Sequence, residues 1–206
     1  NASRAMWLGE NGELAGAAAG TICIDSSTVT VGWVRELAKA AEAKKCEFLD
    51  TPVTGSKNQA AAGELNFLVG GEFATLEKAR PVLAAMSKSI TPIGPVGSGA
   101  LIKLINNFVC GVQIIAIAEA VAMIERSGLD RTRALEVLTQ GAPGSPLVRS
   151  VSARMHAGRY TPNFLLRLLA KDLKYSLEEA DKLSLHLTTA ARSEERRVGK
   201  ESRSRK

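Results

Sequence analysis

One long apolar stretch, bounded by Gly94 and Gly128, constrains this chain of 206 residues more than any other feature. Gly94, Gly97 and Gly99 end whatever precedes it, because glycine adopts backbone angles that other residues resist. The apolar residues that follow cover nearly every direction around a helix of 3.6 residues per turn: Leu101, Ile102, Leu104, Ile105, Phe108, Val109, Val112, Ile115, Ile117, Val121 and Ile124. The sequence therefore predicts a long helix that is buried on most sides.

Three polar residues, Lys103, Asn106 and Asn107, interrupt the apolar start of this helix. Lys103 and Asn107 are four residues apart, so they lie on one helix face. A lysine among apolar residues is costly unless an anionic or polar group meets it. The alternative is a lysine whose ammonium group reaches water along its own side chain. Lys103 is therefore a candidate functional residue.

The segments before this helix alternate between strand and helix patterns. Strands are expected over residues 21–25, 46–50, 65–70 and 90–93, and helices over 31–45 and 74–88. Two of the strands end in loops rich in hydroxyl groups, at 25–28 and 51–56. This order is typical of an open parallel α/β sheet, which binds ligands beyond the carboxyl ends of its strands. Helices over 130–140, 145–157 and 171–185 predict an all-α part after the α/β part.

The net charge of +6 does not indicate a nucleic-acid partner. Residues 192–206 hold seven Lys or Arg against three Glu, a net charge of +4, so most of the basicity belongs to this tail. Aromatic residues make up only 4% of the chain, which argues against a surface that stacks bases. We expect no nucleic-acid partner.

Metal binding and membrane insertion are not expected either. Three cysteines without a Cys-x-x-Cys spacing and two histidines are too few for a recognisable metal site, and they suit a cytoplasmic protein with reduced thiols. No signal peptide opens the chain. Residues 108–124 are at the short limit of a membrane span and include Gln113 and Glu119. The expectation is therefore no metal, no membrane and a cytoplasmic location.

Several motifs resemble, in order and spacing, those of the β-hydroxyacid dehydrogenases. They are Asp25-Ser-Ser-Thr28, Asp50-Thr-Pro-Val-Thr54-Gly55, Gly97-Ser-Gly99 with Lys103 to Asn107, and Phe164 followed by Lys171-Asp172-Leu173. The loops at 52–57 and 141–146 are similar to those of the glyoxylate and succinic semialdehyde reductases. The resemblance extends from Leu8 to Ala191.

The resemblance implies an NAD(P)-dependent enzyme built from a Rossmann domain, a long central helix and a helical carboxyl-terminal domain. Domain boundaries are expected at 1–93, 94–191 and 192–206. The cofactor would be NADP or NAD, with NADPH favoured, and the helical domain would form a homo-oligomer. The roles implied for matching residues are Lys103 as catalytic acid/base, Thr54, Gly55, Ser56, Asn107, Phe164 and Asp172 in substrate binding, and Thr28 and Lys171 in cofactor binding.

The function implied is reduction of a small aldehyde that carries a carboxylate, such as glyoxylate or succinic semialdehyde, and the reverse oxidation of the hydroxyacid. The alternative is a non-catalytic binding or oligomerisation module that kept the fold. Simpler interpretations also exist for single residues. The turn at 54–56 could be an ordinary strand-to-helix turn, Thr28 a helix N-cap, Asn106 a structural residue, and Lys171 with Asp172 a helix-start ion pair.

The chain also departs from the family pattern. Thr54 stands where serine is usual, Ser56 where glycine is frequent, and Val31 where proline is frequent, although no reacting group is lost. No Gly-x-Gly-x-x-Gly turn, which would hold the cofactor pyrophosphate, occurs in the chain. Residues from Arg192 onward resemble a translated sequencing adapter, so the tail is expected to be non-native. We therefore expect a fragment that is truncated at both ends and inactive by itself.

Overall fold

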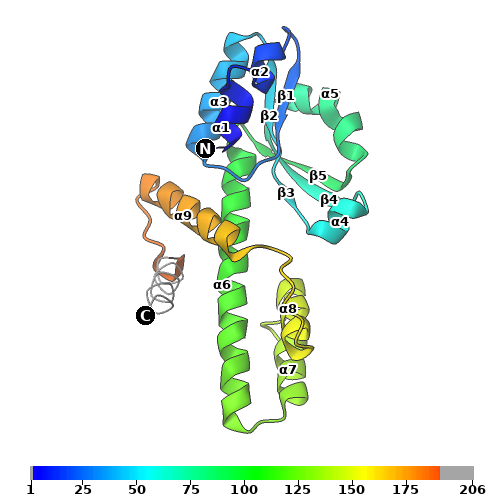
Figure 1. Cartoon of the computed structure of the whole chain (residues 1–206), viewed down its shortest axis with the longest axis vertical. Coiled ribbons are helices and arrows are strands. Elements are labelled where there is room, and N and C mark those ends of the chain that lie inside the picture. Colours follow the sequence, from blue (N-terminus) through cyan, green and yellow to red (C-terminus); the bar gives the residue numbers. More distant parts are fainter. Residues whose placement is uncertain (1, 191–206) are drawn as a thin grey trace. The chain divides into compact units, whose positions relative to one another are not determined.

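The structure, a computed structural model, describes residues 2–190 (Figure 1). It divides into two compact units: unit 1 is Asn1–Ile105, and unit 2 begins at Asn106. Unit 1 contains these elements in order: α1 (Ala2–Leu8), α2 (Glu13–Gly16), β1 (Ile22–Asp25), α3 (Val31–Ala43), β2 (Glu47–Asp50), β3 (Val53–Thr54), α4 (Lys57–Ala61), β4 (Leu65–Gly71), α5 (Phe73–Ala84) and β5 (Ser87–Gly94). The long helix α6 (Ser98–Ser127) begins in unit 1.

The sheet has the order β1-β2-β4-β3, with β5 on β4, and it is mixed rather than parallel. β1 pairs with β2 and β4 pairs with β5 in parallel, whereas β2 and β3 both run antiparallel to β4. The expectation of an all-parallel sheet was wrong at this point. The chain turns back between β3 and β4 through the five-residue helix α4, and a parallel crossover needs a dozen or more residues.

β2 and β3 pair with β4 in a single register. Leu49 and Asp50 face Gly71 and Gly70, and Val53 and Thr54 then face Phe67 and Asn66 in turn. Between them, Pro52 still accepts a hydrogen bond from Leu68 N. The segment from β2 to β3 is therefore one interrupted strand, and the interruption lies directly after Asp50.

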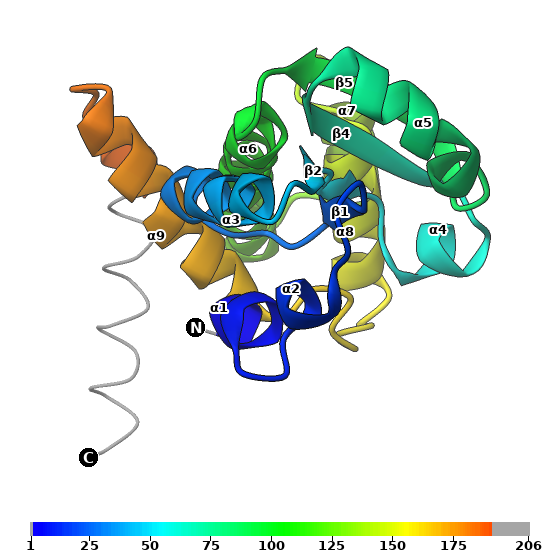
Figure 2. The same ribbon diagram turned by 90° about the horizontal axis from the view of Figure 1, so that it is seen from above.

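Two apolar clusters form the core of unit 1, and Figure 2 shows α3 and α5 on opposite sides of the strands. The cluster under α3 consists of Leu14, Cys23, Val29, Val31, Trp33, Val34, Leu37, Ala41, Cys46, Phe48 and Ala100. The cluster under α5 consists of Leu49, Phe67, Val69, Leu76, Ala79 and Leu83. Ala100 in the first cluster shows that the start of α6 is part of this core.

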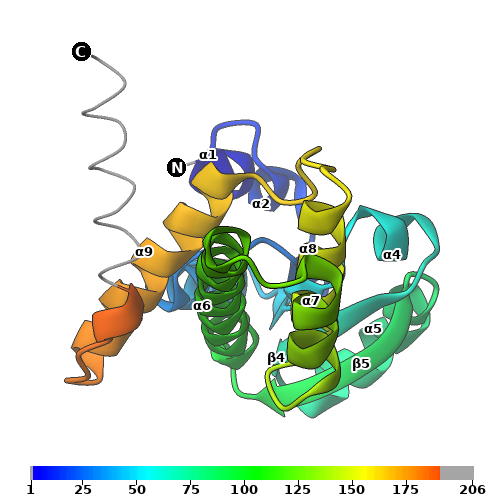
Figure 3. The same cartoon turned by 90° about the horizontal axis from the view of Figure 1, so that it is seen from below.

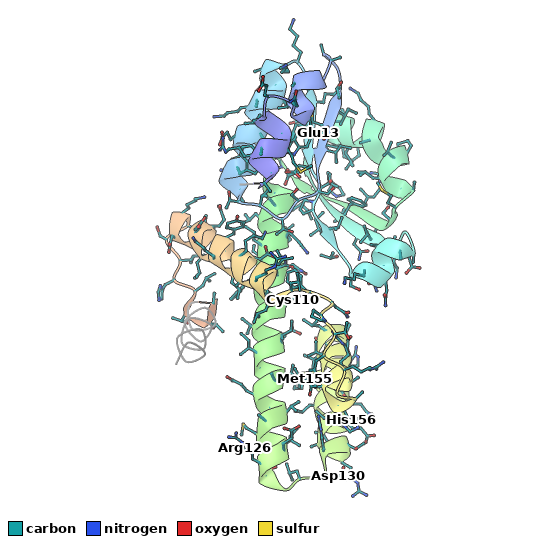
Figure 4. All side chains as sticks on the ribbon, in the orientation of Figure 1. Glu13, Cys110, Arg126, Asp130, Met155 and His156 are labelled. Carbon is teal, nitrogen blue, oxygen red and sulfur yellow. The ribbon has the colours of Figure 1, made fainter. Side chains whose placement is uncertain are left out.

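Unit 2 contains the remainder of α6, then α7 (Arg131–Gln140), α8 (Pro146–His156) and α9 (Leu166–Lys182). α7 and α8 lie beside α6, as Figures 1 and 3 both show. Their apolar side chains meet in one cluster: Ile117, Val121, Ile124, Leu135 and Val148. Asp130 and Ser145 are the N-caps of α7 and α8, because Asp130 accepts a hydrogen bond from Arg133 N at 2.8 Å and Ser145 accepts one from Val148 N at 3.1 Å. Asp130 is labelled at the turn between α6 and α7 in Figure 4.

α6 is less buried than its composition predicts. Ile105, Val109 and Met123 are 46%, 44% and 73% exposed, so the expectation of a helix buried on most sides was wrong for this chain. Within residues 2–190, α6 is also the one helix long and apolar enough to cross a membrane by length and composition. Core helices of soluble proteins pass the same test, so this is weak evidence for a span.

The largest differences from the boundaries expected from the sequence are in α5, β5 and α9. α5 ends at Ala84 and β5 begins at Ser87, so the helix expected to continue to residue 88 is shorter and the last strand longer. α9 begins at Leu166, before the charged pair at 171–172, because the apolar residues there already follow a helical spacing. The tail from Arg192 onward lies outside the described residues.

Candidate active site

Asp50 joins the carboxyl end of β2 to the start of α6. Its Oδ1 accepts a hydrogen bond from Gly97 N and its Oδ2 accepts one from Ala100 N, both at 2.8 Å. Lys103 follows Ala100 by three residues, close to one helical turn, and is half-buried. The candidate catalytic lysine is therefore carried by a helical turn that is attached to the sheet.

The electrostatics of Asp50 are unusual for a carboxylate. The side chain is fully buried, and loss of hydration raises its pKa. The hydrogen bonds from Gly97 N and Ala100 N lower the pKa and so oppose the effect of burial, whereas the nearby charge of Asp25 raises it further. Asp25 and Asp50 are paired in register at the ends of the parallel strands β1 and β2.

The predicted carboxylate-binding turn follows β3. Thr54 pairs with Asn66 across the sheet, and Asn66 Nδ2 donates a hydrogen bond to Thr54 Oγ1 at 3.4 Å. Gly55 has a φ of +122°, a conformation that side-chain-bearing residues rarely adopt. The hydroxyl of Ser56 donates to Gln59 Oε1 at 2.7 Å, and Ser56 N donates to the same oxygen at 2.9 Å. Ser56 thus caps α4, which supports the simpler interpretation for this residue, and its contact with substrate stays a prediction.

The loop after β1 contains the predicted cofactor residue Thr28, which is half-buried. The interpretation of Thr28 as a helix cap was wrong, because Thr30 is the N-cap of α3 and its Oγ1 accepts a hydrogen bond from Trp33 N. Asp25 Oδ1 accepts a hydrogen bond from Ser27 N, whereas the buried Oδ2 has no hydrogen-bond partner among residues 2–190.

This edge of the sheet fits one end of a dinucleotide. Such cofactors bind beyond the carboxyl ends of parallel strands, where β1 and β2 both stop. The buried Asp25 Oδ2 can accept a further hydrogen bond. Ser26, the next residue, shares a hydrogen bond of 2.8 Å between its hydroxyl group and that of Thr51. The residues present therefore suit a polar ligand with hydrogen-bond donors.

In unit 2 the predicted residues Asn107, Lys171 and Asp172 form one polar group, joined by a hydrogen bond and an ion pair. Asn107 Nδ2 donates to Asp172 Oδ2 at 2.7 Å, and Lys171 Nζ lies 2.8 Å from Asp172 Oδ1. Asn106 Nδ2 donates to Asn107 Oδ1 at 3.1 Å, and Lys171 Nζ lies 4.9 Å from the ring centre of Tyr175. Asn107 and Asp172 are 7% and 2% exposed, so the orientation of the Asn107 amide is fixed inside the unit.

Asp172 therefore supports Asn107 and Lys171, and its direct contact with substrate stays a prediction. Phe164 precedes α9 and is 47% exposed. The structure brings Asn107, Lys171 and Asp172 together in unit 2, and it places Lys103 and Thr54 in unit 1.

The three cysteines form no disulfide among the described residues, and Cys110, labelled on α6 in Figure 4, accepts a hydrogen bond from Asn106 Nδ2 at 3.8 Å. Burial raises the pKa of the Cys23 thiol to about 11, with a contribution from neighbouring Cys46. No group of three or more His, Cys, Asp or Glu that could hold a metal occurs in the part of the chain that the structure describes.

Sequence reasoning missed the role of Asp50. The available signal was an aspartate at the end of a predicted strand, followed much later by a glycine-rich helix start. Its partners lie 47 and 50 residues away, so no local pattern connects them. Asn106 was interpreted as structural, and its hydrogen bond to Asn107 is consistent with that.

Comparisons with known proteins cover almost the whole chain. Residues 1–94 match the NAD-binding domain of 6-phosphogluconate dehydrogenase, and residues 97–198 match the NAD-binding domain of NADP-dependent 3-hydroxyisobutyrate dehydrogenase. A 3-hydroxyisobutyrate dehydrogenase of Pseudomonas aeruginosa is 35% identical over 85% of this chain and 61% of its own length. The chloroplastic glyoxylate/succinic semialdehyde reductase 2 of Arabidopsis thaliana is 34% identical over 91% of this chain and 52% of its own length.

The solved structures that this chain resembles include 3-hydroxyisobutyrate dehydrogenases as well. A 3-hydroxyisobutyrate dehydrogenase from Salmonella typhimurium has a TM-score of 0.83 at 28% identity, covering 93% of this chain and 67% of that one. The Mycobacterium tuberculosis 3-hydroxyisobutyrate dehydrogenase, solved with L-serine, has a TM-score of 0.79 at 33% identity, covering 88% and 65%. The chain spans between about half and two thirds of the length of the curated relatives it matches. The motifs, the Rossmann-like fold and these matches together show that the chain belongs to the β-hydroxyacid dehydrogenase family.

Proposed function

We propose that this chain is part of an NAD(P)H-dependent oxidoreductase that interconverts a small aldehyde bearing a carboxylate and its hydroxyacid. Glyoxylate and succinic semialdehyde are the proposed substrates. The observation that carries the proposal is the attachment of the α6 start to the carboxyl end of β2 by Asp50, one helical turn before Lys103. A rigidly held lysine at the ligand-binding edge of a sheet is suited to proton transfer.

Lys103 is the proposed general acid/base. Its ammonium group donates a proton to the carbonyl oxygen during reduction, and its neutral amine accepts the hydroxyl proton during oxidation. A positioned acid of this kind contributes roughly 10²–10⁴-fold to the rate. The bound nicotinamide supplies the hydride. Because the ammonium is positive, it also stabilises the negative charge that develops on the oxygen.

The other residues bind and orient. Thr54, Gly55 and Ser56 offer hydroxyl and backbone N–H groups to the substrate carboxylate, and the positive φ of Gly55 turns the backbone at this point. Asn107, held by Asp172, orients the substrate, and Phe164 and Asp172 border it. Thr28 and Lys171 are the proposed cofactor contacts. NADPH is the proposed form of the cofactor.

The remaining parts of the proposal concern the assembly. The exposed apolar residues of α6 support a homo-oligomer formed through the helical domain, and we place the enzyme in the cytoplasm. The chain contains no Gly-x-Gly-x-x-Gly turn for a pyrophosphate, so its 206 residues alone are expected to show no reductase activity.

The test uses a chimera in which this chain follows the part of the Pseudomonas aeruginosa 3-hydroxyisobutyrate dehydrogenase that it does not match. Reduction of succinic semialdehyde and of glyoxylate is measured with NADPH and with NADH, and butanal serves as the substrate without a carboxylate. The proposal predicts turnover of at least one carboxylate substrate and a kcat/KM at least about tenfold lower for butanal, the loss expected when a charged group goes unpaired. Absence of turnover with both carboxylate substrates, or equal rates with butanal, would contradict it.

A further inference from the structure

The buried carboxylate of Asp50 has no part in the proton and hydride transfers described above. It is fully buried at the last position of β2, and its two oxygens accept hydrogen bonds from two different backbone N–H groups. One of these belongs to Gly97, just before α6, and the other to Ala100 in its first turn. The carboxylate is therefore bonded to the residue just before α6 and to a residue in its first turn.

Close packing removes the freedom that two hydrogen bonds alone would leave. A Cβ added to Gly99 would lie 2.4 Å from Leu68 O and 2.9 Å from Asp50 Oδ2. A Cβ added to Gly70 would lie 2.4 Å from Asp50 Oδ1. The backbone of the helix start and that of β4 thus approach the carboxylate closely from two sides, at Gly99 and Gly70.

The chemistry of the two N–H donors requires a carboxylate. An ionised Asp offers acceptor oxygens on both branches, whereas Asn offers an acceptor on one branch and a donor on the other. Burying this charge is costly, and the charge of Asp25 adds to the cost. An exposed Ser or Thr would cap a helix without that cost. The observed arrangement therefore fixes the position of the start of α6, at a cost in the stability of the fold.

We propose that Asp50 is a positioning residue for the reaction, because it fixes the first turn of α6 and thereby the position of Lys103. The inference rests on the function proposed above for Lys103. Lys103 is three residues beyond Ala100, so a displacement of the helix start moves the lysine with it. A misplacement of about 1 Å at a reacting group can lower a rate by roughly 10²-fold.

The first test needs no activity and uses the present chain. Its lysines are converted to isotope-labelled dimethyl-lysines, and the NMR signal of Lys103 is assigned with Lys103→Arg. In Asp50→Asn the chemical shift of the Lys103 signal should change, because the surroundings of the lysine change, while the signal of exposed Lys39 stays unchanged. Thr75→Val is the matched control, because Thr75 is also buried in unit 1 but its hydroxyl donates to Glu47 and has no contact with α6 among the hydrogen bonds described. An unchanged Lys103 signal in Asp50→Asn would overturn the proposal.

The second test is kinetic and uses the chimera described above. Asp50→Asn should lower kcat by roughly ten- to a hundredfold, with KM for the aldehyde and cofactor affinity within about threefold of the parent. Thr75→Val should keep the parental kcat. A kcat that is unchanged in Asp50→Asn, or a change in KM alone, would overturn the proposal.

Two further outcomes are decisive. If Asp50→Asn does not fold, Asp50→Ser replaces it, since serine keeps an acceptor without placing an amide donor opposite an N–H group. Failure of both variants to fold would assign Asp50 to stability alone and overturn the proposal. An inactive parent chimera would contradict the proposed function instead, and the Lys103 signal would still decide whether Asp50 places the lysine.

Discussion

Gly99→Ala tests the close packing between α6 and the sheet. The added Cβ would lie 2.4 Å from Leu68 O and 2.8 Å from Asp50 O, both backbone atoms, and real Cβ contacts stay beyond 3.0 Å. The helix start must therefore move by about 0.6 Å, which is enough to lengthen the 2.8 Å hydrogen bonds of Asp50 to the limit of a normal bond. Gly99 has no positive φ, so the expected effect is steric and not conformational.

The magnitude follows from two contributions. Forcing an extra methyl group into a packed region costs about 1–3 kcal/mol, and weakening a hydrogen bond to a charged group costs about 1.5–3 kcal/mol. Because the two effects share one displacement, we expect a loss of about 3 kcal/mol in the free energy of unfolding of unit 1. With a typical urea dependence this lowers the unfolding midpoint by roughly 1–2 M.

The assay is urea unfolding followed by tryptophan fluorescence. Both tryptophans, Trp7 and Trp33, belong to unit 1, so their emission reports this unit. Gly16→Ala is the matched control, because nothing lies within 4 Å of the added Cβ and the position is helical. It should change stability by less than about 1 kcal/mol or increase it. A Gly99→Ala variant within about 0.5 kcal/mol of the parent would refute the close packing, since surface changes have effects of that size.

Three further predictions concern other contacts. Cys23 should make the free energy of unfolding fall between pH 9 and 11, because its raised pKa keeps the folded thiol protonated after the unfolded thiol has ionised. Urea unfolding at both ends of this range should show a decrease of about 1–2 kcal/mol in the parent and no such decrease in Cys23→Ala. Thr30→Ala should cost about 1 kcal/mol through loss of the α3 cap, measured by tryptophan fluorescence, and no change would refute the cap. Asp172→Ala should lower the free energy of unfolding by about 2–3 kcal/mol, because Asn107 and Lys171 both lose a partner; unfolding is followed by far-ultraviolet circular dichroism. An unchanged free energy of unfolding would contradict the buried contacts of Asp172.

Local signals in the sequence predicted most elements correctly. The cap at Asp130, the apolar face of α3 and the glycines before α6 each act within a few residues, so the pattern contains the needed information. The direction of β4 was not predicted, because β2 and β3 combine into one interrupted strand only when β4 lies beside them.

The candidate site residues remain a prediction from the sequence, whereas the contacts among them appear only in the structure. Asn107 and Asp172 are separated by 65 residues, and only the fold shows that one holds the other. Thr28 was interpreted from the sequence as a possible cap, whereas the cap of α3 is Thr30, the residue directly before the helix begins. Asp50 looked like part of a motif, whereas its two bonds to the start of α6 depend on tertiary structure.

The most direct test of the account is the effect of Lys103→Ala on turnover and cofactor binding in the chimera. Lys103→Ala should lower kcat by roughly 10²–10⁴-fold while cofactor affinity stays within a few-fold of the parent. Lys103→Arg should also be impaired, because a guanidinium group keeps its proton at neutral pH. Lys39→Ala, on the exposed side of α3, should behave as the parent. Turnover of Lys103→Ala within a few-fold of the parent, or loss of cofactor binding in its place, would contradict the role of Lys103 as the general acid.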